Sequence, residues 1–241
     1  MFTALRFLPA LFLAWPVSAA LQAAPRLPSE APSPERFVPA GWQIETRAQG
    51  DLDGDGRRDL AMILLAGPGV PVRGPAGEES RLLMGAPRVL AIALARPDGG
   101  YRLAVQENAF LPVKRPPNGL SQGWMLFGDG SLAVAGGRLR VIFEYTRAST
   151  TFTFRRERGA FRLIGFDSGG VSAGCFQGLS VNFLTRRAKL TAGWIDRDAE
   201  RVRWRRLPAG LPPALGEIGE GETYDPHGLL TGSALSCPER E

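Results

Sequence analysis

Four aspartates alternate with other residues between positions 51 and 59 of the chain. The segment reads D-L-D-G-D-G-R-R-D, so Asp51, Asp53, Asp55 and Asp59 lie close together in sequence. At an effective dielectric constant near 20, each close pair of carboxylates costs about 4 kcal/mol before salt screening. A hard divalent cation that prefers oxygen ligands removes this repulsion, and Ca²⁺ suits a set of carboxylates best. The segment therefore predicts a calcium-binding loop.

The first half of this loop follows the spacing of an EF-hand, and the second half departs from it. Asp51, Asp53 and Asp55 occupy the first, third and fifth positions, and Gly56 occupies the sixth, where the chain must turn sharply. The twelfth position holds Met62 in place of the bidentate glutamate. The missing carboxylate predicts weak affinity, with a Kd on the order of 10⁻⁴ to 10⁻³ M. Because no histidine or cysteine is near in sequence, we expect a structural ion rather than a catalytic one.

Residues 50–61, which read G-D-L-D-G-D-G-R-R-D-L-A, resemble the calcium loop of the FG-GAP/VCBS type. That loop type occurs in integrin-like propeller blades and in many exported bacterial proteins, where it joins two strands. The resemblance implies that Ca²⁺ is bound by the carbonyl of Arg57 and by the side chains of Asp51, Asp53, Asp55 and Asp59. It covers these residues alone, and the chain has one such loop, whereas a propeller normally has several.

The elements around the loop are predicted to be strands. Apolar and polar residues alternate with a period of two over most of the chain after position 40, and glycine-containing turns separate these stretches. The unbroken apolar run Leu60–Leu65 follows the loop and predicts a strand buried on both faces. We expect an all-β domain of antiparallel hairpins over residues 41–207, built as a sandwich, a barrel or a partial propeller-like fold. An irregular segment is expected over 208–241.

The N-terminal residues have the pattern of an export signal. Arg6 is the only charged residue among the first 20, an apolar run follows it, and Ser18-Ala19-Ala20 offers small residues for cleavage. We therefore predict a signal peptide over 1–20 and an extended proline-rich linker over 21–40. No stretch reaches the ~20 apolar residues of a transmembrane helix. These observations predict a periplasmic or secreted protein with no transmembrane segment in its mature chain.

The chain has two cysteines, Cys175 and Cys237. In an exported protein we expect a disulfide between them, with two free thiols as the alternative. The bond would attach the C-terminal segment to the body of the protein. The loop-entropy model gives such a bond about 4 kcal/mol of stability.

A second short motif allows an enzymatic alternative. Residues 170–174 read G-V-S-A-G and match the G-x-S-x-G elbow of serine hydrolases, with Ser172 as nucleophile and His227 as the later base. The elbow needs a helix after the serine, whereas the residues after Gly174 are poor helix formers. His227 is the only histidine and lies in a turn-like context with proline and glycine. We therefore expect a protein without catalytic activity and retain the hydrolase as an alternative.

Arginine supplies nearly all of the positive charge of this basic chain. The formal net charge is +5, and the stretch Arg201–Arg206 reads R-V-R-W-R-R. Such a stretch is most often the solvated face of a strand, but it also allows a module that binds acidic glycans. The loops beside the aspartate segment are available to a protein partner. Because the chain is expected to be exported, we do not expect a nucleic-acid partner.

Overall fold

The structure is a computed structural model that describes residues 25–67, 86–112, 130–197, 200–232 and 235–237. The signal peptide predicted over 1–20 lies outside the described residues. The elements are, in chain order, β1 (Glu30–Ala31), η1 (Pro34–Phe37), β2 (Trp42–Gly50), β3 (Asp59–Ala66), β4 (Arg88–Ala95), β5 (Tyr101–Glu107), β6 (Leu132–Ala135), β7 (Arg138–Tyr145), β8 (Ala148–Glu157), β9 (Ala160–Ser172), β10 (Cys175–Asn182), β11 (Arg187–Trp194), β12 (Glu200–Arg206), α1 (Leu215–Ile218), η2 (Gly221–Thr223), η3 (Pro226–Gly228) and α2 (Leu229–Gly232).

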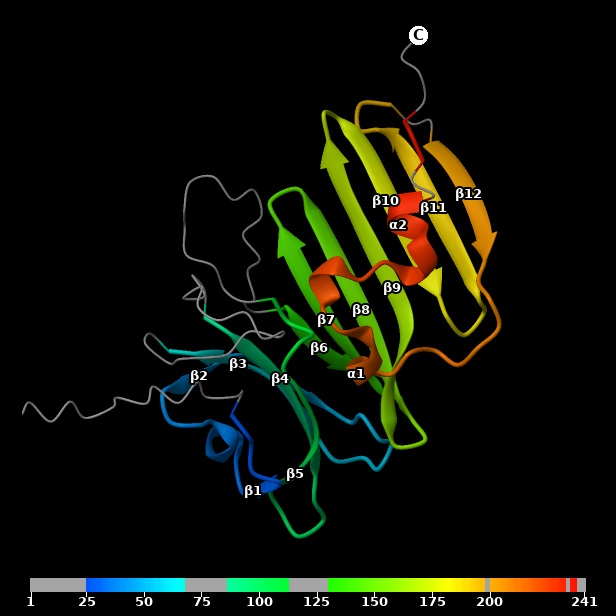
Figure 1. Ribbon diagram of the computed structural model, residues 1–241. Coiled ribbons are helices and arrows are strands. Elements are labelled where there is room, and N and C mark those ends of the chain that lie inside the picture. The colour runs from blue at the N-terminus through cyan, green and yellow to red at the C-terminus, as the bar shows by residue number, and fades with distance from the viewer. Residues whose placement is uncertain (1–24, 68–85, 113–129, 198–199, 233–234, 238–241) are drawn as a thin grey trace, which may run out of the picture.

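The described strands form two antiparallel sheets (Figure 1). The smaller sheet has five strands in the order β1-β5-β4-β3-β2, and the larger has seven in the order β12-β11-β10-β9-β8-β7-β6. Except for β1, which pairs with β5, neighbouring strands are consecutive in sequence, so the sheets are built from hairpins. The all-β prediction is confirmed, and neither sheet closes into a barrel. No helix among the described residues is long and apolar enough to cross a membrane.

The apolar run after the aspartate loop forms β3, which is buried along its whole length. One face of β3 contributes Ala61 and Ile63 to the main core, which the five-stranded sheet shares with the seven-stranded sheet. The other face contributes Leu60, Met62 and Leu64 to a second core, on the opposite side of the five-stranded sheet. The two cores explain why this strand has no polar alternation, since neither of its faces meets water.

The N-terminal proline-rich segment covers this second core. An extended, poorly packed linker was expected over 21–40, but from residue 25 onward the segment includes β1 and the short helix η1. Leu27, Ala31 and Phe37 are buried against the five-stranded sheet, and Phe37 has no exposed surface. The physical reason is that these apolar side chains cover a sheet face that would otherwise lie in water. The prolines restrict the backbone without preventing this packing.

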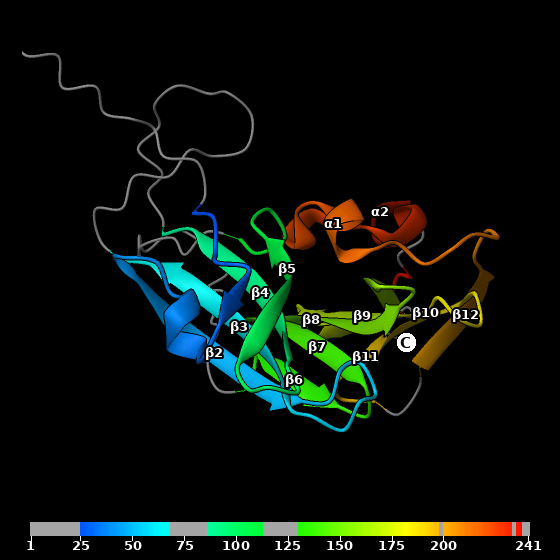
Figure 2. The same cartoon turned by 90° about the horizontal axis from the view of Figure 1, so that it is seen from below.

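The inner face of the seven-stranded sheet carries most of the main core. Phenylalanines from neighbouring strands meet Phe110 there, and its ring centroid lies 4.9 Å from that of Phe152 in an edge-to-face arrangement. The C-terminal segment adds Leu215, Leu229 and Leu235 to the same core. Figures 1 and 2 show its short helices lying over this face of the sheet. Where it is described, the segment expected to be irregular thus forms short helical turns that cover the core.

Candidate metal centre

The aspartate loop is the connection of a β-hairpin. It leaves β2 at Gly50 and enters β3 at Asp59, and these two residues pair with each other across the hairpin. Gly54 and Gly56 have φ values of +85° and +83°, in the left-handed region that residues with a side chain rarely adopt. The glycines therefore let the backbone curl so that the aspartates point toward a common centre.

Three of the four aspartates come together. Asp51, Asp53 and Asp59 each present one carboxylate oxygen, and these oxygens all lie within 4.8 Å of one another. The donor set consists entirely of hard oxygen atoms and carries a formal charge of −3, which suits a hard divalent cation. Among the described residues, the cluster consists of carboxylates alone. Its chemistry therefore fits the binding of a metal ion.

Asp51 organises the loop backbone. Its Oδ1 accepts hydrogen bonds from the N–H groups of Asp53 at 3.2 Å and Gly54 at 2.6 Å, and its Oδ2 accepts one from Gly56 at 2.9 Å. The N–H groups of Gly56 and Gly54 hold the pKa of Asp51 below its ordinary value. The carboxylate is thus kept ionised, which is the state that binds a cation.

Asp59 connects the loop to the sheet from a buried position. Its side chain has no exposed surface; Oδ2 accepts the N–H of Leu52 at 2.7 Å and Oδ1 accepts the N–H of Ala95 at 2.8 Å. Burial raises the pKa of Asp59, these two N–H groups lower it, and the negative charges of Asp53 and Asp55 raise it further. Each oxygen retains a lone pair for a second partner. A cation placed among the three carboxylates would offset both the burial and the repulsion.

Asp55 does not belong to this group of three. Its carboxylate forms an ion pair with the guanidinium group of Arg57, and Nε of Arg57 also donates a hydrogen bond to the carbonyl of Ala95 at 3.3 Å. The sequence predicted the side chain of Asp55 and the carbonyl of Arg57 as ligands. That assignment stays a prediction. The structure shows the carboxylate of Asp55 paired with the guanidinium group of Arg57 and not grouped with the other three carboxylates.

Sequence reasoning did not assign a role to Leu52, the one apolar side chain between Asp51 and Arg58. It is 3% exposed and packs into the main core, while its N–H holds Asp59. The detectable signal was a single large apolar residue inside a strongly acidic turn. Leu52 ties the loop to the core, so a change in the loop reaches the packing between the two sheets.

The loop also lies where the two sheets approach each other. Gly50 leads into it, and a Cβ atom at Gly50 would lie 2.7 Å from Cγ1 of Val134 in β6. Figure 2 shows the end of β2 beside β6. A side chain at position 50 would push the edge strands of the two sheets apart, so glycine permits this close approach.

The two residues of the hydrolase alternative are not brought together. Ser172 ends β9 and, after a two-residue turn, pairs with Cys175 at the start of β10. His227 lines a cavity of about 280 Å³ with Phe183, which follows the other end of β10. The length of β10 between these ends is about 23 Å at ~3.3 Å per residue. A hairpin also stands where the elbow requires a helix.

The predicted disulfide between Cys175 and Cys237 is confirmed, with the two Cα atoms 5.9 Å apart. Next to it, Nε2 of Gln177 donates a hydrogen bond to the carbonyl of Leu235 at 2.6 Å. Both interactions fasten the C-terminal segment to β10, as the sequence analysis expected of the disulfide. A disulfide of this kind is typical of oxidising compartments.

Comparisons of the chain with protein-family models, with the curated proteins and with the solved structures find no match. The function is therefore inferred from the residues of the site itself.

Proposed function

We propose that this protein is an exported, non-catalytic β-protein in which a bound Ca²⁺ ion stabilises the hairpin loop between β2 and β3. The observation that carries the proposal is the convergence of Asp51, Asp53 and Asp59 within 4.8 Å. Ca²⁺ is favoured because flexible, all-oxygen sites with several carboxylates suit its variable coordination, whereas Mg²⁺ demands stricter geometry. The likeness of residues 50–61 to FG-GAP/VCBS loops supports the same ion.

The structural role follows from the contacts of the loop. Asp59 links the loop to β4 through Ala95, Leu52 links it to the main core, and Gly50 lies against β6 of the other sheet. An ion bound among the three carboxylates would offset most of their repulsion and would therefore stabilise the junction of the two sheets as well as the turn. The disulfide between Cys175 and Cys237 supports the proposed periplasmic or secreted location.

Calcium titration tests this proposal. Isothermal titration calorimetry with CaCl₂ should detect binding by the wild type after treatment with EDTA, and a hundredfold excess over Kd should add about 2.7 kcal/mol to the unfolding free energy. The variant D51N/D53N should lose both the heat and the stabilisation. The charge-matched variant E144Q/E220Q changes exposed residues outside the loop and should keep both. No heat from the wild type at millimolar Ca²⁺, or equal heats from the two variants, would refute the proposal.

The hydrolase alternative receives no support from the placement of Ser172 and His227. We expect a fluorophosphonate probe to leave Ser172 unlabelled, and mass spectrometry of the treated protein measures this directly. Covalent labelling at Ser172 that S172A abolishes would establish an enzyme and contradict the non-catalytic proposal.

A further inference from the structure

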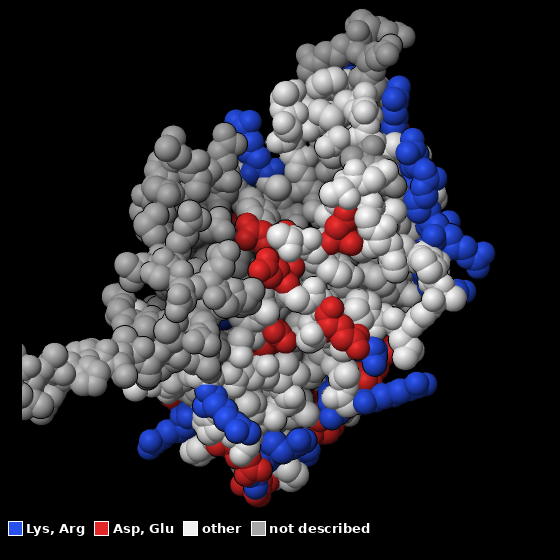
Figure 3. All heavy atoms as spheres, viewed as in Figure 1, with Lys and Arg blue, Asp and Glu red and all other residues white. Residues whose placement is uncertain are grey.

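The last strand of the larger sheet, β12, is an edge strand of the described sheet and is exposed along its whole length. All seven residues of β12 are exposed, and the strand pairs only with β11 among the described strands. In Figure 3 the lysine and arginine side chains form a blue stripe down this edge, while acidic side chains gather elsewhere, over the centre of the same view. A strand exposed on both faces contributes little to the core, so stability does not account for its composition.

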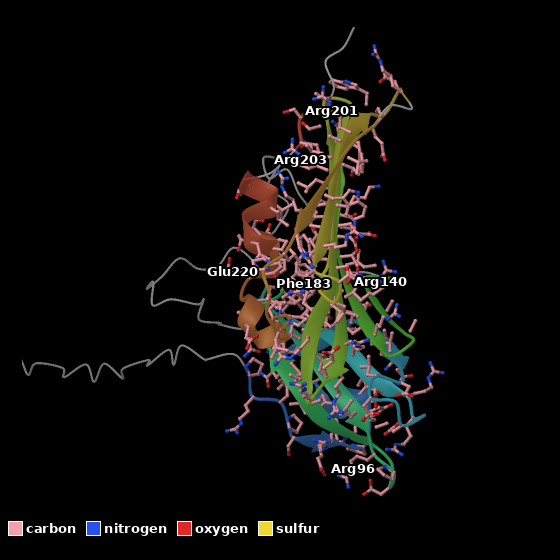
Figure 4. The ribbon with its side chains drawn as sticks, turned by 90° about the vertical axis from the view of Figure 1, so that its right-hand side faces the viewer. Arg96, Arg140, Phe183, Arg201, Arg203 and Glu220 are labelled. Carbon is pink, nitrogen blue, oxygen red and sulfur yellow. A yellow bond between two sulfur atoms is a disulfide. The ribbon has the colours of Figure 1, made fainter. Side chains whose placement is uncertain are left out.

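Three arginines project from one face of this strand at regular intervals. Arg201, Arg203 and Arg205 alternate along β12, and the residues paired with them in β11 are Ala192, Leu190 and Ala188, which are buried in the main core. Successive members of the row are about 6.8 Å apart, since two residues of a strand rise ~3.4 Å each. Figure 4 shows Arg201 and Arg203 on the side of the sheet that carries the helices, and Arg140 on the opposite side.

The described part of the chain provides no carboxylate partner for this row. The ion pair that it shows at this hairpin joins Lys189 to Glu200 at 3.7 Å, on the opposite face. Arg201, Arg203 and Arg205 take part in none of the described ion pairs or side-chain hydrogen bonds. Three guanidinium groups in a row repel one another, and an external anion chain would remove that repulsion.

We propose that the Arg201–Arg203–Arg205 row binds a linear acidic polysaccharide laid along the edge of the sheet. Carboxylate and sulfate groups match the planar fork of guanidinium, which forms paired hydrogen bonds with such anions. A straight row fits a single extended chain better than a globular partner. This binding role does not depend on the metal, because the row belongs to the sheet edge formed by β11 and β12 and the aspartate loop belongs to the other sheet.

The arginine face favours a glycan over a single-stranded nucleic acid. Binding of single-stranded nucleic acid combines cationic contacts with aromatic side chains on which the bases stack. The aromatic residue of β12, Trp204, lies on the opposite face and is paired with Lys189. The guanidinium of Arg187 lies over its ring, 4.5 Å from the centroid. The row therefore offers charges in line without a stacking platform.

The experiment uses a heparin decasaccharide as the probe and measures Kd by calorimetry over a series of salt concentrations. The test variant is R203Q/R205Q. The matched control is R138Q/R140Q, which removes two exposed arginines with the same spacing from β7. Circular dichroism and thermal melting confirm that both variants fold.

If each contact to a single-chain polyanion contributes about 0.7 to the slope of log Kd against log salt, three arginines give a slope of about 2. The variant R203Q/R205Q should lose about 1.4 of that slope and bind at least tenfold more weakly at low salt, whereas the control should keep the wild-type slope. R203K/R205K should keep most of the slope but bind more weakly than the wild type, because lysine lacks the fork.

Three results would overturn the proposal. The first is the absence of heparin binding by the wild type at low salt, which would leave the arginines as a charged edge that only prevents strand pairing. The second is equal weakening in R203Q/R205Q and R138Q/R140Q, which would make the attraction a matter of net charge. The third is tighter binding of a single-stranded DNA of equal charge, which would replace the glycan with a nucleic acid.

Discussion

Replacement of the buried Asp59 with asparagine separates the role of this residue in the fold from its role in binding an ion. The carboxylate accepts the N–H of Leu52 at 2.7 Å through one oxygen and the N–H of Ala95 at 2.8 Å through the other. In D59N one of these oxygens becomes an NH₂ group. This hydrogen-bond donor then faces the backbone N–H of Leu52 or Ala95, which is also a donor. Measured in EDTA, the effect of D59N on stability contains no contribution from a bound metal.

The magnitude follows from the two hydrogen bonds. A bond to a charged group contributes about 1.5–3 kcal/mol and a neutral bond about 0.5–1.5 kcal/mol. D59N therefore loses one charged bond and weakens the other by about 1 kcal/mol. Burial raises the pKa of Asp59 because it disfavours the charged carboxylate. Removing this buried charge in D59N therefore offsets part of the lost stability. We expect a net loss of about 2–3 kcal/mol, which corresponds to a Tm lower by about 4–12 °C for a domain of this size.

Urea unfolding followed by tryptophan fluorescence in EDTA measures this loss. The control is D167N, which changes an exposed aspartate whose partner is the hydroxyl of Ser180 at 2.6 Å. As a surface substitution, D167N should change stability by no more than about 0.5 kcal/mol. If D59N unfolds at the same urea concentration as the wild type, Asp59 does not hold the loop to the sheet, and the account of the junction is wrong.

Three further predictions concern the rest of the fold. Cys175 and Cys237 close a loop of sequence separation 62, so C175S/C237S should lower the unfolding free energy by up to about 4 kcal/mol, measured by urea unfolding against the oxidised wild type. Arg88 and Glu45 form a buried, two-bond ion pair at 2.6 and 2.8 Å, so R88M should cost about 3–5 kcal/mol, and a loss below 1 kcal/mol in the same assay would contradict this. Burial raises the pKa of Asp225, but the N–H groups of Leu230 and Thr231 hold it below its ordinary value overall. Its contribution is therefore present above the ordinary aspartate pKa and is lost as the pH falls through the lower folded value. The Tm difference between wild type and D225N, measured by thermal melting over an acidic pH series, should therefore close as the pH falls below the ordinary aspartate pKa.

The hairpin architecture was predictable because its signals are local. Period-two alternation marks strands, and glycine-containing turns such as Arg158-Gly159 between β8 and β9 mark their ends. The run Leu60–Leu65 was predicted to be buried on both faces, and β3 confirms it. The division into two sheets was not predictable, because strand alternation gives the buried face of each strand but not which strands share a sheet.

The candidate site was predictable in its residues and only partly in its geometry. Alternating aspartates and two glycines indicated a turn that gathers carboxylates, and Asp51, Asp53 and Asp59 do converge. The ion pair between Asp55 and Arg57 was not foreseen, since the charge pattern alone does not tell which carboxylate a nearby guanidinium neutralises. The packing of the proline-rich segment was also missed, because its composition is that of a linker and its role depends on a sheet face formed later in the chain.

The sequence by itself determined the strands, the acidic loop and the pair of cysteines, because each depends on residues that are neighbours in the chain or on the count of one residue type. Only the tertiary structure decided that Asp59 is buried beside β4, that Ser172 and His227 lie at opposite ends of β10, and that the arginines of β12 lie in line on an edge strand of the described sheet. The physical reason is that burial, separation and edge position depend on which distant strands pack together. That choice is made by the whole apolar surface of the chain and not by any single motif.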